Sequence, residues 1–242
     1  MLKTAICYFS GSGNSFDVTL ELCKYIDAET IFYIPNLDVK KLDAFDEIII
    51  VTPIYQFNIP KTVQDFIRKL NPDLRYYIVI NYAGLMVNAA YKLKKLFKHC
   101  NLELASIHRV IMPTSFSIAF VEPDAMEKAI LKSAAKKIHR IANRILKNEK
   151  RKLSYRLVGK FKRFVGYKSF SHYLSADSSC SQCMQCVKLC PTQNIRSFHG
   201  GIDFGEKCIF CMGCYNRCEH IKYKGKRGKT YTNPNVDFNH MR

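Results

Sequence analysis

CSQCMQCVKLCPTQNIRSFHGGIDFGEKCIFCMGCYNRC, residues 180–218, contains eight of the eleven cysteines in this 242-residue chain. It consists of two copies of the spacing Cys-x-x-Cys-x-x-Cys-x-x-x-Cys. The first copy is Cys180, Cys183, Cys186 and Cys190, and the second is Cys208, Cys211, Cys214 and Cys218. Three thiolates two residues apart on one loop can each reach a different iron of a cube, whereas the fourth cannot easily turn back to it. The spacing therefore predicts iron–sulfur clusters.

This run resembles the one that holds two cubane [4Fe-4S] clusters in bacterial ferredoxins, where the fourth cysteine of each copy ligates the other cluster. The resemblance implies two crossed ligand sets. Cluster one would take Cys180, Cys183, Cys186 and Cys218, and cluster two would take Cys208, Cys211, Cys214 and Cys190. A segment of about 50 residues is too small to build much apolar core, so it would fold around its cofactors. Glu219 is a departure, because a proline usually follows the second run.

Two other uses of cysteine fit this spacing less well. Zinc fingers and ribbons pair Cys-x-x-Cys units across a long spacer and do not add a third and fourth thiol at once. Disulfides need an oxidising compartment, but the first ten residues read as a strand and not as a signal peptide, so a cytoplasmic location is expected. The remaining Cys7, Cys23 and Cys100 are expected to pack as small hydrophobic residues.

A second motif opens the chain. Leu2–Phe9 is an apolar run that predicts a strand, and an amphipathic helix to about Ile26 follows the next six residues. Those six residues are Ser10, Gly11, Ser12, Gly13, Asn14 and Ser15. A strand, a loop of glycines and hydroxyls, and a helix N-terminus together form a phosphate cradle, in which the serines and Asn14 can add side-chain donors. The loop contains no lysine, which suits a terminal monophosphate; the alternative is a plain turn with an N-cap.

The remaining patterns alternate between strand and helix. Strands are predicted at 30–34, 47–52, 76–81 and 104–112, and helices at 61–70, 88–99 and 125–147. With the first strand, this predicts an α/β fold in which helices cover both faces of a five-stranded parallel sheet. Ligands of such sheets bind at the carboxyl ends of the strands. Besides the phosphate loop, those ends carry Pro53, Ile54, Tyr55 and Phe57, then Asn81, Tyr82, Ala83 and Gly84.

Residues 1 to about 145 resemble a flavodoxin, whose FMN phosphate loop reads Ser/Thr-x-Ser/Thr-Gly-Asn-Ser/Thr and matches SGSGNS at every specified position. TPIY followed by Pro60 is also typical of flavodoxin-like proteins. With the cysteine run behind it, the whole chain resembles the flavodoxin-plus-ferredoxin fusions, or ferrodoxins, of anaerobic bacteria and archaea. The resemblance implies a flavodoxin-like doubly wound sheet, a small α+β ferredoxin-like domain, FMN and two [4Fe-4S] clusters. Many flavodoxins use a tryptophan beside the flavin, but this chain has none; Tyr55, Phe57 and Tyr82 are the available aromatics.

These patterns divide the chain into four parts. We expect an FMN domain at 1–147, a basic connector at 148–173, a two-cluster domain at 174–224 and a polar tail at 225–242. The net charge is +18, and residues 128–168 alone contain 15 lysines or arginines and one acidic side chain. Such a segment favours an acidic redox partner protein, although a solvated helix face, a peripheral membrane contact or a nucleic-acid contact would also explain it.

The function expected from these features is intracellular electron transfer between FMN, the two clusters and a redox partner. A flavin accepts two electrons and a cluster one, so joining them in one chain gives a two-to-one electron converter. No side-chain set in the sequence predicts a catalytic acid, base or nucleophile. The alternatives are a reductase acting on a small substrate such as a quinone or corrinoid, and a nucleic-acid-binding module with structural metal clusters.

Overall fold

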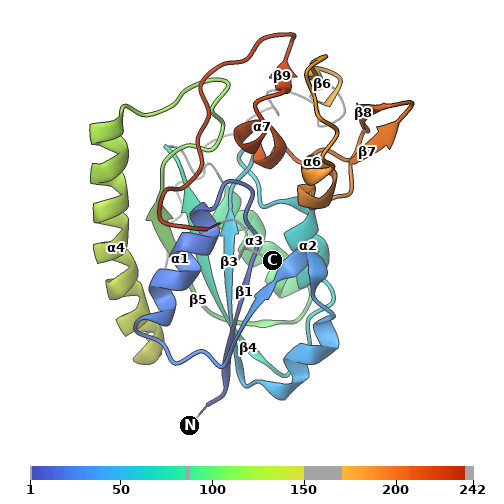
Figure 1. The fold of residues 1–242 in the computed structure, drawn as a ribbon. Helices are drawn as coiled ribbons and strands as arrows, with labels where there is room; N and C mark the ends of the chain where they lie inside the picture. Colours follow the sequence, from blue (N-terminus) through green and yellow to red (C-terminus); the bar gives the residue numbers. More distant parts are fainter. Residues whose placement is uncertain (1, 85–87, 150–170, 238–242) are drawn as a thin grey trace.

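The computed structural model describes residues 2–84, 88–149 and 171–237. Its core is a five-stranded parallel sheet in the order β2-β1-β3-β4-β5 (Figure 1). This is the flavodoxin-like doubly wound order, so the predicted fold class is confirmed. The strands are β1 (Thr4–Tyr8), β2 (Thr30–Tyr33), β3 (Glu47–Pro53), β4 (Arg75–Tyr82) and β5 (Glu103–Ile111).

Helices cover both faces of the sheet because the central strands are apolar on both sides. Along β3, Ile48 and Ile50 pack with the helices on one face, whereas Ile49 and Val51 pack with those on the other. The first face carries α2 (Lys61–Ile67) and α3 (Ala89–His99), and the second carries α1 (Asn14–Cys23) and α4 (Asp124–Leu146). All five strands and all four helices fall where the sequence predicted them, with ends shifted by a few residues. Two 3-10 helices, η1 (Ile34–Asn36) and η2 (Val39–Ala44), were not predicted.

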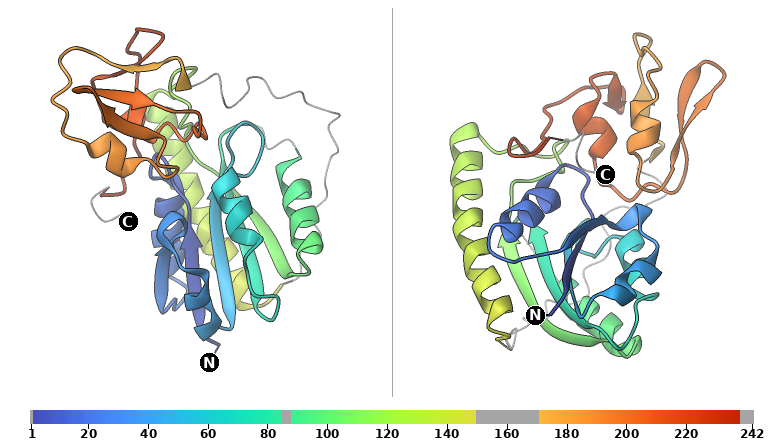
Figure 2. Two further views of the ribbon diagram at one scale, coloured as in Figure 1. Left: turned by 90° about the vertical axis from the view of Figure 1, so that its right-hand side faces the viewer. Right: turned by 60° about the horizontal axis from the view of Figure 1, so that its bottom comes forward.

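The cysteine-rich region forms a second, smaller body. Its elements are β6 (Leu174–Ala176), α6 (Gln185–Leu189), β7 (Ile195–Phe198), β8 (Gly201–Phe204), α7 (Gly213–Arg217) and β9 (Ile221–Tyr223). β6 pairs with β9 and β7 pairs with β8, both antiparallel. In both views of Figure 2 this body lies at one end of the parallel sheet, opposite the N-terminus. That end is where the strands finish and where α/β sheets bind their ligands.

Most of the predicted connector, 150–170, lies outside the described residues. The tail does not extend away from the protein: its described part, 225–237, has no helix or strand but returns to α1 and buries Tyr231, Asn233 and Val236. Among the described residues, no helix combines the length and the apolar character needed to cross a bilayer.

Candidate functional site

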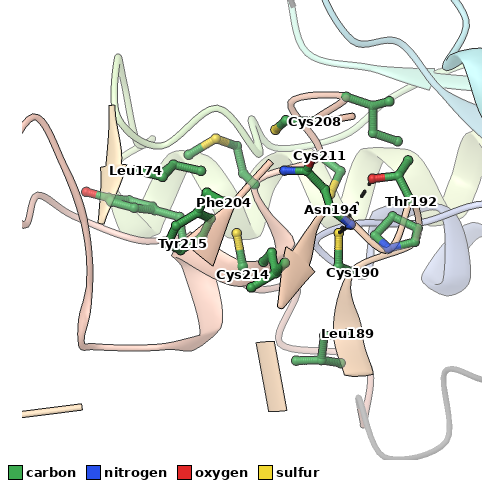
Figure 3. A pocket seen from close by; sticks show the side chains of 14 residues that line it. Leu174, Leu189, Cys190, Thr192, Asn194, Phe204, Cys208, Cys211, Cys214 and Tyr215 are labelled. Atoms are coloured by element: carbon green, nitrogen blue, oxygen red, sulfur yellow. Dashed lines mark hydrogen bonds between the residues drawn. The ribbon is translucent and has the colours of Figure 1, made fainter. Parts of the chain in front are cut away.

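Four cysteines surround one cavity in the smaller body. Figure 3 shows Cys190, Cys208, Cys211 and Cys214 around a space that is otherwise lined largely by apolar side chains, including those of Leu174, Leu189, Phe204 and Tyr215. Cys190 comes from the first run and the other three from the second. The structure thus brings together the four thiols that the crossed assignment gives to cluster two.

Each of these four sulfurs has a backbone N–H directed at it. Asn194 donates to Cys190 Sγ over 3.2 Å. The N–H groups of Phe210, Gly213 and Tyr215 bond the sulfurs of Cys208, Cys211 and Cys214, in that order. Hydrogen bonds to sulfur stabilise a thiolate, and around an iron–sulfur cluster they help to set its reduction potential.

Without metal, burial would keep the thiols of Cys208, Cys211 and Cys214 protonated. Burial raises the pKa of Cys208 to about 11 and that of Cys211 to about 12, and it raises the pKa of Cys214 well above its ordinary range. The backbone N–H bonds oppose this shift without cancelling it. Because a metal takes up the thiolate form, cluster insertion would have to displace these protons.

The other four cysteines border a more open hollow. Cys180, Cys183, Cys186 and Cys218 line it, together with Arg217 and His220. Burial raises the pKa of Cys186, and the proximity of Cys218, Cys180 and Cys183 raises it further, so Cys186 interacts with the other three. Cys183 is exposed. This is the set that the crossed assignment gives to cluster one.

The two cysteine loops share one backbone geometry. Gln182 and Met184 in the first loop have φ of 54° and 58°, and Phe210 and Met212, at the equivalent positions 28 residues later, have φ of 62° and 57°. Non-glycine residues adopt this left-handed conformation at a cost, and it is concentrated at functional sites. Residues of positive φ recur in backbone nests, whose successive N–H groups point into a concavity that holds anions and iron–sulfur clusters.

In the part of the chain that the structure describes, no three His, Cys, Asp or Glu side chains lie close enough together to hold a single metal ion. A [4Fe-4S] cube needs cysteines that are farther apart, because each of its four thiolates binds a separate iron.

The predicted phosphate loop joins β1 to α1 as expected. Gly13 has φ of 96°, a conformation that favours glycine, and as the N-cap residue it has no side chain to cap α1. The N–H groups of the first turn, which have no intrahelical acceptor, therefore gain none from the N-cap residue. Ser10 Oγ accepts the N–H of Gly13, which leaves its own proton available to a ligand. These donors, with the Ser12 hydroxyl, fit a phosphate group.

Two other loop side chains are already committed to protein acceptors. Asn14 Nδ2 donates to the carbonyl oxygen of Pro113 over 2.7 Å, and Ser15 Oγ donates to Asn81 Oδ1 over 2.6 Å. Asn81 lies one residue before the end of β4, so this second bond fixes α1 against one of the strand ends assigned to the flavin. The side chains of Asn14 and Ser15 therefore hold the loop in shape. The donors for a phosphate are the Ser10 and Ser12 hydroxyls and the N–H groups of the first turn of α1.

The phosphate loop contacts the cluster-two loop directly. A Cβ added to Gly11 would lie 2.3 Å from the carbonyl oxygen of Cys211, so only glycine fits here. Arg217 Nη2 donates to the carbonyl oxygen of Gly11 over 3.0 Å and brings a positive charge to a loop that has none of its own. Arg217 was not identified from the sequence, since 206 residues separate the two partners and no local pattern joins them.

A tight turn at residues 55–58 follows the end of β3. Tyr55 and Asn58 exchange backbone hydrogen bonds of 2.9 and 3.0 Å, and Gln56 and Phe57 between them have φ of 48° and 58°. Positive φ at both central residues defines a type I′ turn, which normally selects asparagine or glycine. Gln56 Oε1 is buried with no hydrogen-bond partner among the described residues. A strained turn with an unpaired buried acceptor is the kind of surface that a hydrogen-bonding ligand such as a flavin ring fits.

The three candidate flavin-stacking aromatics occupy different environments. Tyr55 is buried under the phosphate loop, where the Gly11 N–H bonds its hydroxyl. Burial and the nearby Cys211 raise the pKa of Tyr55 well above its ordinary value. Phe57 and Tyr82 are half-buried, and Pro53 is buried beside the half-buried Ile54. Ala83 and Gly84 are exposed at the end of β4, next to residues outside the description.

The fold, the phosphate loop and the paired cysteine runs define a class: a redox protein that combines a flavin-binding domain with an iron–sulfur domain. Comparison with family models identifies the same two kinds of domain. Residues 5–114 match a flavodoxin domain, and residues 164–222 match a 4Fe-4S dicluster domain. The chain is therefore a flavodoxin–ferredoxin fusion, as its sequence predicted.

Solved structures similar to this chain include several flavodoxins. One from the domain Archaea is 12% identical, covers 60% of this chain and 99% of its own, and has a TM-score of 0.42. The flavodoxin of Megasphaera elsdenii is 17% identical, covers 55% and 98%, and has a TM-score of 0.41. General stress protein 14 of Treponema denticola, solved in complex with FMN, is 12% identical, covers 58% and 98%, and has a TM-score of 0.40. No curated protein matches the chain.

The two domains assign a general role. A flavodoxin domain implies FMN, and a 4Fe-4S dicluster domain implies iron–sulfur clusters. Together they support electron transfer that involves a flavin and iron–sulfur.

Proposed function

We propose that this protein passes electrons between FMN and two [4Fe-4S] clusters held in the same chain, and from there to a redox partner. The observation that carries the proposal is the contact between Gly11 and Cys211, because it packs the FMN phosphate loop against the loop of cluster two. Two redox domains joined only by a connector would have no need of a backbone contact that excludes every side chain at position 11.

The contacts also suggest an order for the two clusters. Cluster two, with Cys190, Cys208, Cys211 and Cys214, would be the neighbour of the flavin domain. Cluster one includes the exposed Cys183 and borders the more open hollow, so it is the better placed to meet a partner. Electrons would therefore move between flavin, cluster two, cluster one and the partner.

The chain's own residues would contribute position and electrostatics. Ser10, Ser12 and the first N–H groups of α1 would hold the phosphate, and Phe57 and Tyr82 would flank the ring system. When bound, FMN supplies the ability to accept two electrons and release them singly. The N–H groups on the four sulfurs of cluster two would favour its charged states, and the apolar cavity wall would exclude water.

The proposal also includes an acidic partner protein and a cytoplasmic location. A segment with 15 basic residues and one acidic residue suits an acidic protein partner, since charge complementarity steers association. Most of this segment after α4 lies outside the described residues. A reducing cytoplasm is part of the proposal, because dense cysteine usage in that compartment serves metal or redox chemistry.

One experiment tests the flavin half of this proposal. Ser12→Glu places a carboxylate in the phosphate loop, where like charge opposes the phosphate, so FMN binding measured by flavin fluorescence quenching should be lost. Ser181→Glu, at an exposed position between two cysteines of the first run, is the matched control and should bind FMN like the wild type. Equal FMN affinity in the wild type and Ser12→Glu would show that the loop is only a turn.

A further inference from the structure

The C-terminal tail crosses directly over the phosphate loop. The Tyr231 hydroxyl donates to Asn14 Oδ1 over 2.7 Å, and Asn233 Nδ2 donates to the same oxygen over 3.0 Å. The backbone N–H of Asn233 donates to the carbonyl oxygen of Ser12, also over 3.0 Å. Tyr231 is 3% exposed and Asn233 only 1%, so these contacts are made inside the protein and not on its surface.

These bonds fix the start of α1. Asn14 is the first residue of the helix, and its Nδ2 donates to the carbonyl oxygen of Pro113. With two donors from the tail on Oδ1, the Asn14 amide is held from both ends. The helix N–H groups that would face a phosphate follow Asn14 in the first turn, so their direction depends on this residue.

Further contacts keep the tail in place. Asn233 Nδ2 and Asn235 Nδ2 donate to Asp17 Oδ2 over 3.0 and 3.1 Å, and Val236 belongs to the same apolar core as Phe16. A buried amide such as that of Asn233 is costly unless it is hydrogen-bonded, and here both its N–H groups and its carbonyl oxygen have partners. The segment is therefore a specific fit and not a loose covering.

The other end of the segment is joined to the cluster domain. The Tyr231 N–H donates to Asn216 Oδ1 over 3.2 Å, and Asn216 lies in α7 between Cys214 and Cys218. Tyr231 thus links the helix that contains the cluster ligand Cys214 to the first residue of the helix at the phosphate loop.

We propose that Tyr231 and Asn233 are positioning residues for the phosphate of FMN. They hold Asn14 and the Ser12 carbonyl so that the N–H groups at the start of α1 keep a geometry that receives the phosphate. The inference rests on the proposed FMN site but goes beyond it, because it assigns a binding role to a C-terminal segment outside both domains.

The test compares two flavins that differ only in the phosphate. FMN and riboflavin affinities are measured by fluorescence quenching for the cluster-loaded wild type, Tyr231→Phe and Asn233→Ala. A hydrogen bond in such a site contributes about 1 kcal/mol and about 1.4 kcal/mol is a tenfold change, so each variant should bind FMN at least roughly fivefold more weakly. Riboflavin binds more weakly than FMN because it has no phosphate. For the same reason, the riboflavin affinity of each variant should stay within about twofold of the riboflavin affinity of the wild type.

Thr232→Ala is the matched control, because Thr232 lies between the two residues but is exposed; it should change neither affinity. Unchanged FMN affinity in both tail variants would overturn the inference. Equal weakening of FMN and riboflavin would also overturn it, since the tail would then stabilise the domain as a whole. A wild-type chain that binds neither flavin would overturn the proposed function and this inference with it.

Discussion

Arg217 donates a hydrogen bond to the carbonyl oxygen of Gly11 across 3.0 Å, and so joins α7 of the cluster domain to the phosphate loop of the flavin domain. The Arg217 charge also lowers the pKa of both Tyr55 and Cys211, although burial is the larger effect on each. One guanidinium therefore acts on the loops of both cofactor sites.

Removing that charge should make cluster two harder to reduce. A reduced cluster carries one more negative charge than an oxidised one, and a nearby cation stabilises it. Arg217→Gln should therefore lower the midpoint potential of cluster two, by about 50 mV if roughly 1.2 kcal/mol of one-electron stabilisation is lost. Arg217→Lys retains the charge and should recover most of the shift. Anaerobic redox titration followed by electron paramagnetic resonance measures both, and a potential unchanged in Arg217→Gln would contradict the assignment.

The contact between Gly11 and Cys211 should govern electron transfer between the domains. A methyl group on Gly11 meets the Cys211 carbonyl oxygen at 2.3 Å, so Gly11→Ala must push the two loops apart. Flavin-to-cluster transfer after flash reduction should slow severalfold, while the iron content stays the same. At Gly201 the added carbon meets its nearest atom at 3.5 Å, so Gly201→Ala is the control and should transfer electrons at the wild-type rate. Equal rates in both variants would show that electrons do not use this contact.

The crossed ligand sets predict which cluster each fourth cysteine serves. Cys218→Ser should damage cluster one and leave cluster two next to the flavin, whereas Cys190→Ser should do the reverse. Flash reduction of the flavin should therefore still reduce a cluster rapidly in Cys218→Ser but not in Cys190→Ser. Cys100→Ser, outside both runs, should keep all its iron. The opposite kinetic result would mean that each run ligates its own cluster.

Reduction of the true partner should depend on salt. If the basic segment steers an acidic protein, the rate should fall as ionic strength rises, and charge reversal at Lys150, Arg151 and Lys152 should slow it at low salt. Lys3, Lys40 and Lys41 are exposed residues of the FMN domain outside this segment, so their reversal is the matched control. If reversal of Lys150, Arg151 and Lys152 leaves the reduction rate unchanged but abolishes binding to RNA or anionic vesicles, the docking proposal fails. The basic segment would then bind nucleic acid or a membrane surface.

Local patterns account for what the sequence predicted well. The parallel sheet with helices on both faces follows from alternating strands and helices, and the grouping of the eight cysteines follows from a repeat whose spacing only certain cofactors fit. The contacts of Arg217, Tyr231 and Asn233 with residues 11–14 join segments more than 200 residues apart, and a single sequence carries no signal for such pairs. The tail reads as a polar, irregular segment because its role lies in specific hydrogen bonds and not in any periodic pattern.

The same limit applies to the aromatic residues. Tyr55, Phe57 and Tyr82 were equivalent candidates in the sequence because each follows a predicted strand. Burial separates them: Tyr55 lies beneath the phosphate loop and against Cys211, whereas the other two keep an accessible surface. Which of them reaches the flavin depends on how the cluster domain packs on the sheet, and no pattern within residues 1–147 encodes that packing.

The central claim is that one chain holds FMN and two [4Fe-4S] clusters as a connected electron store. An anaerobic reductive titration of the reconstituted protein tests it most directly, with flavin and cluster absorbance followed together. FMN takes two electrons and each cluster takes one, so full reduction should consume about four electron equivalents per chain, with about eight iron and eight sulfide present. A protein that accepts only two equivalents at the flavin, or that contains two zinc ions and no sulfide, would contradict the account.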